Sequence, residues 1–230
     1  MDVNTHTPIL EQEVLDICTN LSIYNHYHFV KTNNPSKDLP YHNWYHALCV
    51  VKSCYNGAQH YNLSMPVMRA LCVAALWHDY GHSGGKHADS YNIIAANRAY
   101  LNFHLSLVSS ETRDYDSDLA HVPGIIRITE YPYVNSPVSI EQKIMRDADL
   151  MQITYPTWYE MCIRRLGDEI SVSRGRTVTE LEMVEGQIEF LQNTKMCTGW
   201  GNDASAYSKI VNISNLINRK EALQGDAAGE

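Results

Sequence analysis

The sequence predicts an all-α protein, a single helical bundle within a chain of 230 residues. Apolar residues recur at helical spacing in one segment after another, and no alternating strand pattern or fixed-period repeat is visible. The length suits one well-buried domain and is short for two of typical size. We therefore expect one domain over residues 1–220 and a flexible tail of small and polar residues at 221–230.

The N-terminal segment 7–23 is predicted to form an amphipathic helix. Thr7 would cap it and Pro8 would occupy its first helical position, and apolar residues follow at near-helical spacing. A loop is expected at 32–40, which is rich in asparagine and proline. The stretch 41–61 is then predicted to run as a second helix.

A central buried helix is predicted at 65–77, because this segment is apolar almost all round. Gly81, Gly84 and Gly85 follow it and are expected to end the helix where the chain must change direction. A further helix is predicted over roughly 88–105.

Two capping boxes predict helix starts in the C-terminal half. Ser139 and Gln142 form an S-x-x-Q pattern ahead of apolar residues that continue to Ile153. Thr177 and Glu180 repeat this pattern ahead of another apolar run. We expect a helix to begin at each of these caps.

Charge and cysteine usage restrict the class of protein. The formal net charge of −8 and the pI near 5.7 give no general attraction for nucleic acid or an anionic membrane, so a small substrate neutralised locally by a metal fits better. The cysteines form no CxxC pair and no segment is typical of a signal peptide or membrane span, which favours a cytoplasmic protein with reduced thiols. The cysteines are Cys18, Cys49, Cys54, Cys72, Cys162 and Cys197.

Histidines and aspartates form a pattern that is typical of a metal site. His42 and His46 lie four residues apart, which on one helix would place both side chains on one face. His78 and Asp79 follow the buried helix, where a charged group is costly unless it is paired or binds a cation. These four residues are candidates for one centre.

The segment RDADL adds two candidate carboxylates, Asp147 and Asp149. Two residues apart on a helix means about 200° apart, so only one of the two can face the site well. Two imidazoles and two carboxylates suit a divalent ion with open positions for water, which implies catalysis; manganese, iron, cobalt, zinc, nickel and magnesium are the candidates. Isolated histidines are treated as ordinary core or surface residues: His6, His26, His28, His60, His104 and His121.

At these residues the sequence resembles the HD superfamily of metal-dependent phosphohydrolases, and within it the catalytic domain of class I cyclic-nucleotide phosphodiesterases. The similar blocks appear in the family's order between residues 41 and 190. They are YHNWYHALCV (41–50), ALWHDYGHSGG (75–85), DADL (147–150), LGDE (166–169) and EGQIEF (185–190).

The resemblance implies a ligand set for the first metal ion: His46, His78, Asp79 and Asp149. Asp79 would also bridge to a second ion, and Asp149 rather than Asp147 falls on the family's ligand position. The helix at 88–105 lacks the glutamate of the family's matching segment, which leaves the second metal site open.

The resemblance also implies roles around the substrate. His42 matches the general acid that protonates the leaving oxygen, and His82 matches the histidine of the second-metal and phosphate region. Gln187 matches the glutamine that bonds the purine edge and Phe190 the aromatic clamp; as i and i+3 on a helix they would share a face. Alternatively, Gln187 is solvated surface and Phe190 belongs to the core.

The function that the resemblance implies is hydrolysis of a 3',5'-cyclic nucleotide, or a related cyclic signal, to the 5'-monophosphate by metal-activated water. One alternative is removal of phosphate or triphosphate from a purine (deoxy)nucleotide by the same metal core. Another is a catalytically inactive HD domain that binds a nucleotide. The family's helical N-terminal portion has no evident counterpart in the sequence, and the oligomeric state stays open.

Overall fold

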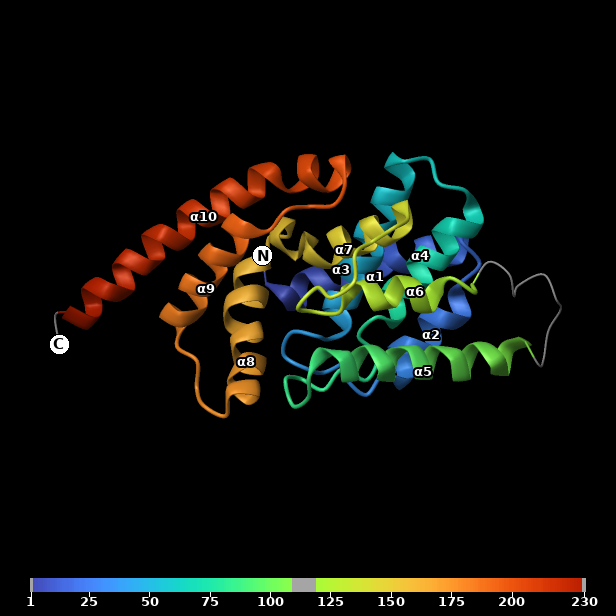
Figure 1. The fold of residues 1–230 in the computed structure, drawn as a ribbon, viewed down its shortest axis with the longest axis horizontal. Helices are drawn as coiled ribbons and strands as arrows, with labels where there is room; N and C mark the ends of the chain where they lie inside the picture. Colours follow the sequence, from blue (N-terminus) through green and yellow to red (C-terminus); the bar gives the residue numbers. More distant parts are fainter. Residues whose placement is uncertain (1, 109–118, 229–230) are drawn as a thin grey trace.

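The computed structural model describes residues 2–108 and 119–228, and all regular structure within them is helical (Figure 1). The predicted all-α class is therefore confirmed. Short 3₁₀ segments, η2 (Arg127–Thr129) and η3 (Met151–Thr154), and one π-helical segment, η4 (Glu160–Arg165), interrupt the α-helices. The α-helices are α1 (Val3–Asn20), α2 (Tyr24–Asn33), α3 (Trp44–His60), α4 (Met65–Trp77), α5 (Asp89–Val108), α6 (Val122–Ile126), α7 (Ile140–Leu150), α8 (Leu166–Arg174), α9 (Glu180–Asn193) and α10 (Gly199–Ala228).

The main core is built around α3 and α4, which pack against each other, while α1 and α7 pack on α3. Both central helices are buried along most of their length, as the apolar segment at 65–77 predicts. Leu48, Trp77 and Ile144 are among the fully buried side chains that join these helices. Burial of this apolar surface is the main force that holds the bundle together.

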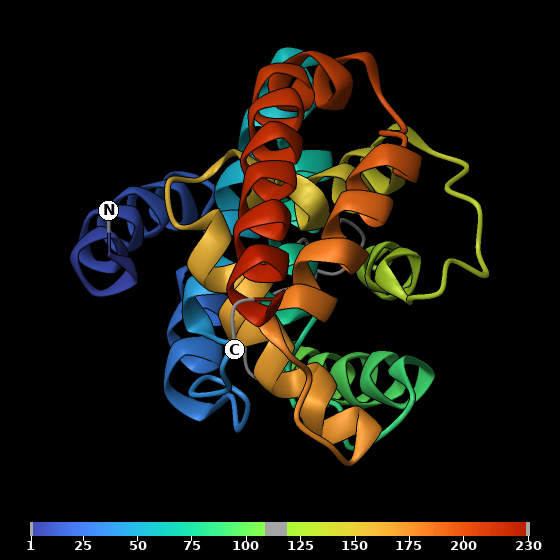
Figure 2. The ribbon, with the colours of Figure 1, turned by 90° about the vertical axis from the view of Figure 1, so that its left-hand side faces the viewer.

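A second, smaller core joins η4, α9 and α10. Ile163, Val184 and Leu216 are buried in it, and α9 and α10 lie side by side along the same edge of the molecule (Figures 1 and 2). The tail that the sequence predicts at 221–230 differs in the structure, where α10 remains helical to Ala228. Leu223 also packs against this core, so apolar burial extends the helix past residue 220.

The first helix begins earlier than the sequence predicts. Asp2 caps α1 and accepts a hydrogen bond from the backbone N–H of Asn4, so the helix includes Thr7 rather than starting there. Pro8 lies inside the helix, where it removes one backbone donor. The cap at Thr7 was wrong because a better capping side chain lies five residues upstream.

The helix predicted at 41–61 begins at Trp44. Asn43 is its cap: the Asn43 side chain accepts a hydrogen bond of 3.1 Å from the backbone N–H of His46. His42 therefore precedes α3, and the prediction that His42 and His46 share one helix was wrong. The α4 prediction matches the structure, and Gly81, Gly84 and Gly85 follow it with positive φ angles of 75°, 61° and 84°.

Of the two predicted capping boxes, one is shifted. Ser139 caps α7 as predicted, but the box is incomplete, because the Gln142 side chain accepts a hydrogen bond from the backbone N–H of Val138 and not of Ser139. The helix α7 ends at Leu150, where η3 begins. The box of α9 is formed by Thr179 and Glu182, two residues after the predicted pair. Glu180 instead pairs with Arg219 of α10 at 2.8 Å, so its carboxylate is engaged elsewhere.

The structure also bears on the expectations about membrane spans and cysteines. Among the helices of residues 2–108 and 119–228, none is both long enough and apolar enough to cross a membrane. All six cysteines are free thiols, five of them buried and Cys197 half-buried.

Candidate metal and nucleotide site

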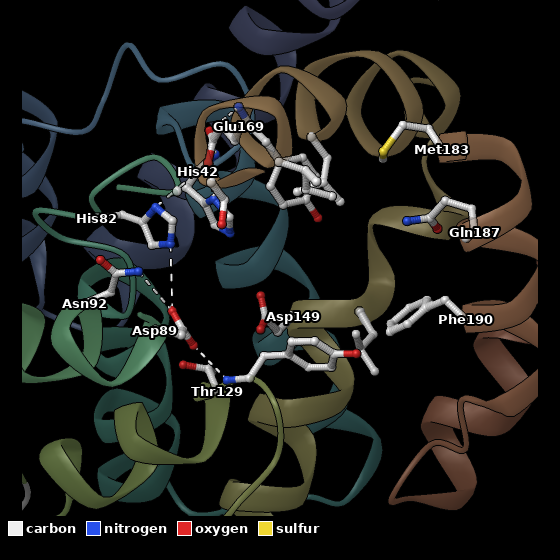
Figure 3. A pocket seen from close by; sticks show the side chains of 18 of the residues that line it. His42, His82, Asp89, Asn92, Thr129, Asp149, Glu169, Met183, Gln187 and Phe190 are labelled. Atoms are coloured by element: carbon white, nitrogen blue, oxygen red, sulfur yellow. Dashed lines mark hydrogen bonds and ion pairs between the residues drawn. The ribbon is translucent and has the colours of Figure 1, made fainter. Parts of the chain in front are cut away.

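A cavity of about 980 Å³ lies where the loop before α3, the loop after α4, the start of α5, the loop before α7, and helices α8 and α9 meet. Figure 3 shows His42, His82 and Asp89 on one side of it and Met183, Gln187 and Phe190 on the other, with Asp149 between them. Segments from both halves of the chain thus supply its walls.

Two of the four predicted ligands, Asp79 and Asp149, line this cavity, and the buried His46 and His78 contact them. His46 Nε2 lies 3.1 Å from Asp149 Oδ1, 3.5 Å from Asp79 Oδ2 and 3.4 Å from His78 Nε2. His78 Nε2 lies 3.0 Å from Asp79 Oδ2 and 3.6 Å from Asp149 Oδ1. Ligand atoms held about 2.0–2.2 Å from one ion are separated by roughly 2.8–3.6 Å. The ligand atoms of His46, His78 and Asp79 therefore form a group spaced to hold one divalent cation, and Asp149 lies beside its two histidines.

The hydrogen bonds of His78 show that this cluster needs positive charge at its centre. His78 Nδ1 lies 2.8 Å from the carbonyl of Ala75, which only accepts, so Nδ1 carries a proton, and in the neutral form of the ring Nε2 presents a lone pair. That lone pair faces Asp79 Oδ2, a buried oxygen without a hydrogen-bond partner in the described part of the chain. A cation between the two atoms would satisfy both.

The same demand for positive charge appears in the pKa values. Burial by itself would lower the pKa of His78, but the carboxylates of Asp79 and Asp149 raise it well above its usual value. Burial likewise opposes ionisation of Asp79, yet the neighbouring histidines hold the pKa of its carboxyl well below the usual range. The carboxylates therefore attract positive charge, which a proton on His78 supplies without a metal ion and which a bound cation would supply in its place.

Asp147 points away from this cluster. Its carboxylate accepts hydrogen bonds from the backbone N–H groups of Cys197 (2.6 Å) and Thr198 (2.9 Å) and from the Thr198 hydroxyl (2.6 Å). It thereby fixes the start of α10. The structure places Asp149, and not Asp147, beside the two histidines.

His42 forms a pair with Glu169 of α8, a residue whose role the sequence did not reveal. His42 Nδ1 lies 2.6 Å from Glu169 Oε2, while Glu169 Oε1 accepts hydrogen bonds from the backbone N–H groups of Tyr41 and His42. Burial lowers the pKa of His42, but Asp79 and Glu169 outweigh it and the net shift is upward. The pair is separated by 127 positions in sequence, so only the LGDE block hinted at it.

His82 stacks on His42, with ring centroids 3.7 Å apart. Its Nδ1 accepts a hydrogen bond from the backbone N–H of Gly84, and Nε2 lies 3.8 Å from Asp89 Oδ1. Burial, and then the positive charge of His42, lowers the pKa of His82 to about 4. His42, His82 and Glu169 form a second group of side chains with the spacing to hold an ion.

Gln187 and Phe190 project from α9 into the same cavity, on the wall that faces the metal cluster (Figure 3). Both are partly exposed, and the Gln187 amide has no hydrogen-bond partner among the residues described. An amide and a ring on one helix face are thus available to a planar ligand. Of the candidate residues, the structure places Asp147 apart, and the others lie at the cavity or contact residues that line it.

Asp89, at the start of α5, is a further cavity residue that the sequence analysis missed. Its carboxylate accepts hydrogen bonds from the backbone N–H of Tyr131 (2.7 Å) and the side chain of Asn92 (3.0 Å). Burial raises its pKa. Asp89 therefore connects the loop after α4 to the loop before α7, an arrangement that no short-range pattern encodes.

Comparison with known proteins adds no relative. No protein-family model matches the chain, and no curated protein matches it.

Proposed function

We propose that the chain is a divalent-metal-dependent phosphohydrolase of the HD type that cleaves a phosphodiester. The observation that carries the proposal is the cluster of His46, His78, Asp79 and Asp149, in which five inter-ligand distances fall between 3.0 and 3.6 Å. The cluster opens into a cavity large enough for a nucleotide. Resemblance of the sequence blocks to class I phosphodiesterases supports the same assignment.

A divalent ion, when bound, lowers the pKa of a water ligand and offsets negative charge on phosphate oxygens. The protein's part is to hold four ligand atoms in place and to orient the substrate. Two carboxylates and two neutral imidazoles leave a formally neutral site when a dication is bound, which suits an anionic substrate. Asp79 interacts electrostatically with His42 and His82 of the second group, which also includes Glu169.

His42 is the proposed general acid. Glu169 holds the His42 ring through Nδ1, so Nε2 is the nitrogen left to carry a proton to the leaving ribose oxygen. The upward shift in the pKa of His42, caused by Asp79 and Glu169, favours the protonated ring that this role needs. Glu169 is the carboxylate partner that such a histidine needs beside a metal ion.

The charges that line the cavity favour a phosphodiester over a nucleoside triphosphate. Within the described residues, the lysines and arginines of its wall are Arg174 and Lys195, and Arg174 already lies 3.9 Å from Glu182. A triphosphate carries more negative charge than a diester and is usually bound by several cationic groups. A 3',5'-cyclic nucleotide or related cyclic signal is therefore the leading substrate, with purine (deoxy)nucleotides as the alternative.

Metal analysis of the purified protein, together with a manganese-supplemented substrate screen, tests this proposal. Cyclic nucleotides and nucleoside mono- and triphosphates form the screen, and the Asp79→Ala variant is its control because it lacks one ligand. We expect bound metal and hydrolysis of a cyclic nucleotide by the wild type, with both lost in the variant. Metal binding without hydrolysis of any of these compounds would instead indicate an inactive nucleotide-binding module.

A further inference from the structure

The loop between η2 and α7, residues 130–139, exposes aromatic side chains that the proposed chemistry does not use. Tyr131 is 57% exposed and Tyr133 38% exposed, although both line the cavity. Large aromatic side chains are costly to leave in water, and exposed ones beside a cavity are typical of ligand contacts. This loop faces α9, which carries Phe190, across the cavity.

The Tyr133 ring packs against the buried side chain of Arg146. The guanidinium carbon of Arg146 lies 4.1 Å from the centroid of the Tyr133 ring, a cation–π contact. Arg146 is itself buried and donates hydrogen bonds to the carbonyl of Ile128, at 3.0 and 3.2 Å, and to the carbonyl of Asn135. Arg146 thus bonds the backbone on either side of Tyr133, at Ile128 and at Asn135, and covers one face of the Tyr133 ring. The Tyr133 ring lines the cavity and is 38% exposed, so part of its surface is available to a ligand.

Tyr131 separates this ring from Phe190. The rings of Tyr131 and Tyr133 meet edge to face, with centroids 5.4 Å apart and planes at 88°. On its other side Tyr131 lies 6.5 Å from Phe190, centroid to centroid, with planes at 69°. The backbone N–H of Tyr131 is fixed by Asp89. The cavity therefore has two aromatic surfaces, one at Phe190 and one at Tyr133, and the ring of Tyr131 meets both at steep interplanar angles.

The size of the cavity agrees with two aromatic surfaces. Pockets for small ligands span roughly 300–1,000 Å³, and this cavity of about 980 Å³ is at the upper end of that range. A single nucleotide bound at the metal cluster with its base against Phe190 and Gln187 would leave the Tyr133 surface unused. The space and the rings suit a second base.

We propose that Tyr133, supported by Arg146, is a second base-stacking subsite and that the substrate class is a dinucleotide, two bases joined through a phosphodiester. This inference rests on the proposed function for the phosphodiester bond that is cleaved. Stacking on a preorganised ring is effective because no side-chain freedom is lost when the ligand binds.

Binding by calorimetry of AMP and of the dinucleotide pApA tests the subsite in the metal-loaded protein, with a methylene group in place of the bridging ester oxygen of pApA so that neither compound is turned over. The wild type should bind pApA about 10-fold more tightly than AMP, as one stacked base contributes on that order. Tyr133→Ala should abolish this advantage and leave AMP binding unchanged, whereas Tyr133→Phe should retain it. Tyr207→Ala, an exposed tyrosine of α10, is the matched control.

Equal affinity of the wild type for pApA and AMP would overturn the inference. So would an equal loss for both ligands in Tyr133→Ala, because the ring would then belong to the first nucleotide's site. A screen in which no phosphodiester is hydrolysed, while the preference for pApA and its dependence on Tyr133 persist, would refute the hydrolase and leave the dinucleotide subsite standing.

Discussion

Asp147 and Asp149 leave the last turn of α7 in opposite directions, and their carboxylates meet different partners. We predict that Asp149→Asn lowers the metal content strongly with little loss of stability, because its carboxylate belongs to the cluster. Asp147→Asn should keep the metal but lose about 1–3 kcal/mol of stability, since an amide cannot accept all three hydrogen bonds. Metal analysis and urea unfolding measure both effects. The reverse ranking for metal content would move the ligand by two residues.

His42 can be tested separately from the metal. His42→Ala should retain metal, because the His42 ring pairs with Glu169 and lies outside the four-atom cluster. Turnover of a natural phosphodiester should fall about 100-fold or more, the usual contribution of a general acid. On a p-nitrophenyl phosphodiester, whose leaving group needs no proton, the defect should shrink sharply. Loss of metal, or equal impairment on both substrates, would make His42 a structural residue instead.

At the scale of a helix, the cap of α9 provides a prediction that also tests its shifted start. Thr179 accepts a hydrogen bond from the backbone N–H of Glu182, and the Glu182 carboxylate accepts one from the backbone N–H of Thr179. Thr179→Ala should cost about 1 kcal/mol of stability. Thr177→Ala is the matched control, because Thr177 lies outside the helix, and it should change the unfolding midpoint little. A larger loss at Thr177 would restore the start that the sequence predicts.

The helix boundaries show which parts of the fold could be predicted from the sequence. α4 was predicted to the residue because its apolar run ends at both sides in clear signals. The starts of α1 and α9 were missed, since neighbouring polar residues offer several caps and only tertiary contacts choose between them. Glu180 illustrates this, because its pairing with Arg219 depends on α10.

The candidate site divides in the same way. The candidate metal ligands and His42 could be predicted because each lies in a short, recognisable motif of the sequence, although His42 proved to lie before α3. Glu169 and Asp89 could not be predicted, because their partners are distant in sequence and meet them only when the helices pack. Residue spacing reports local geometry, whereas these contacts depend on the assembled bundle.

On the scale of the whole molecule, His26 predicts how stability depends on pH. The ring is fully buried, and its Nδ1 accepts a hydrogen bond of 3.1 Å from Trp77 Nε1. Burial, and then the nearby His104, lowers the pKa of His26 to about 3. Below pH 6.5 the unfolded chain therefore binds a proton that the folded protein does not, and the free energy of unfolding falls as the pH drops toward 3.

This contribution reaches at most about 1.4 kcal/mol per pH unit. Urea unfolding of the wild type and of His26→Asn between pH 7 and pH 4 should show a shallower pH dependence for the variant. His60→Asn, an exposed position at the end of α3, is the control. Identical slopes for the wild type and His26→Asn would show that His26 is not the group responsible.

The contact between Asp147 and the start of α10 has a consequence for any mutational scan of this protein. A Cβ atom on Gly201 would lie 2.4 Å from Asp147 Oδ2, so even alanine at this position would push the carboxylate from its place. Asp147 lies only two residues before Asp149 on α7, so a displaced Asp147 would also disturb the backbone that carries Asp149. In a scan scored by activity alone, variants of Gly201 and Asp147 would lower the activity through loss of folded protein and be mistaken for variants of catalytic residues, unless protein abundance is measured alongside.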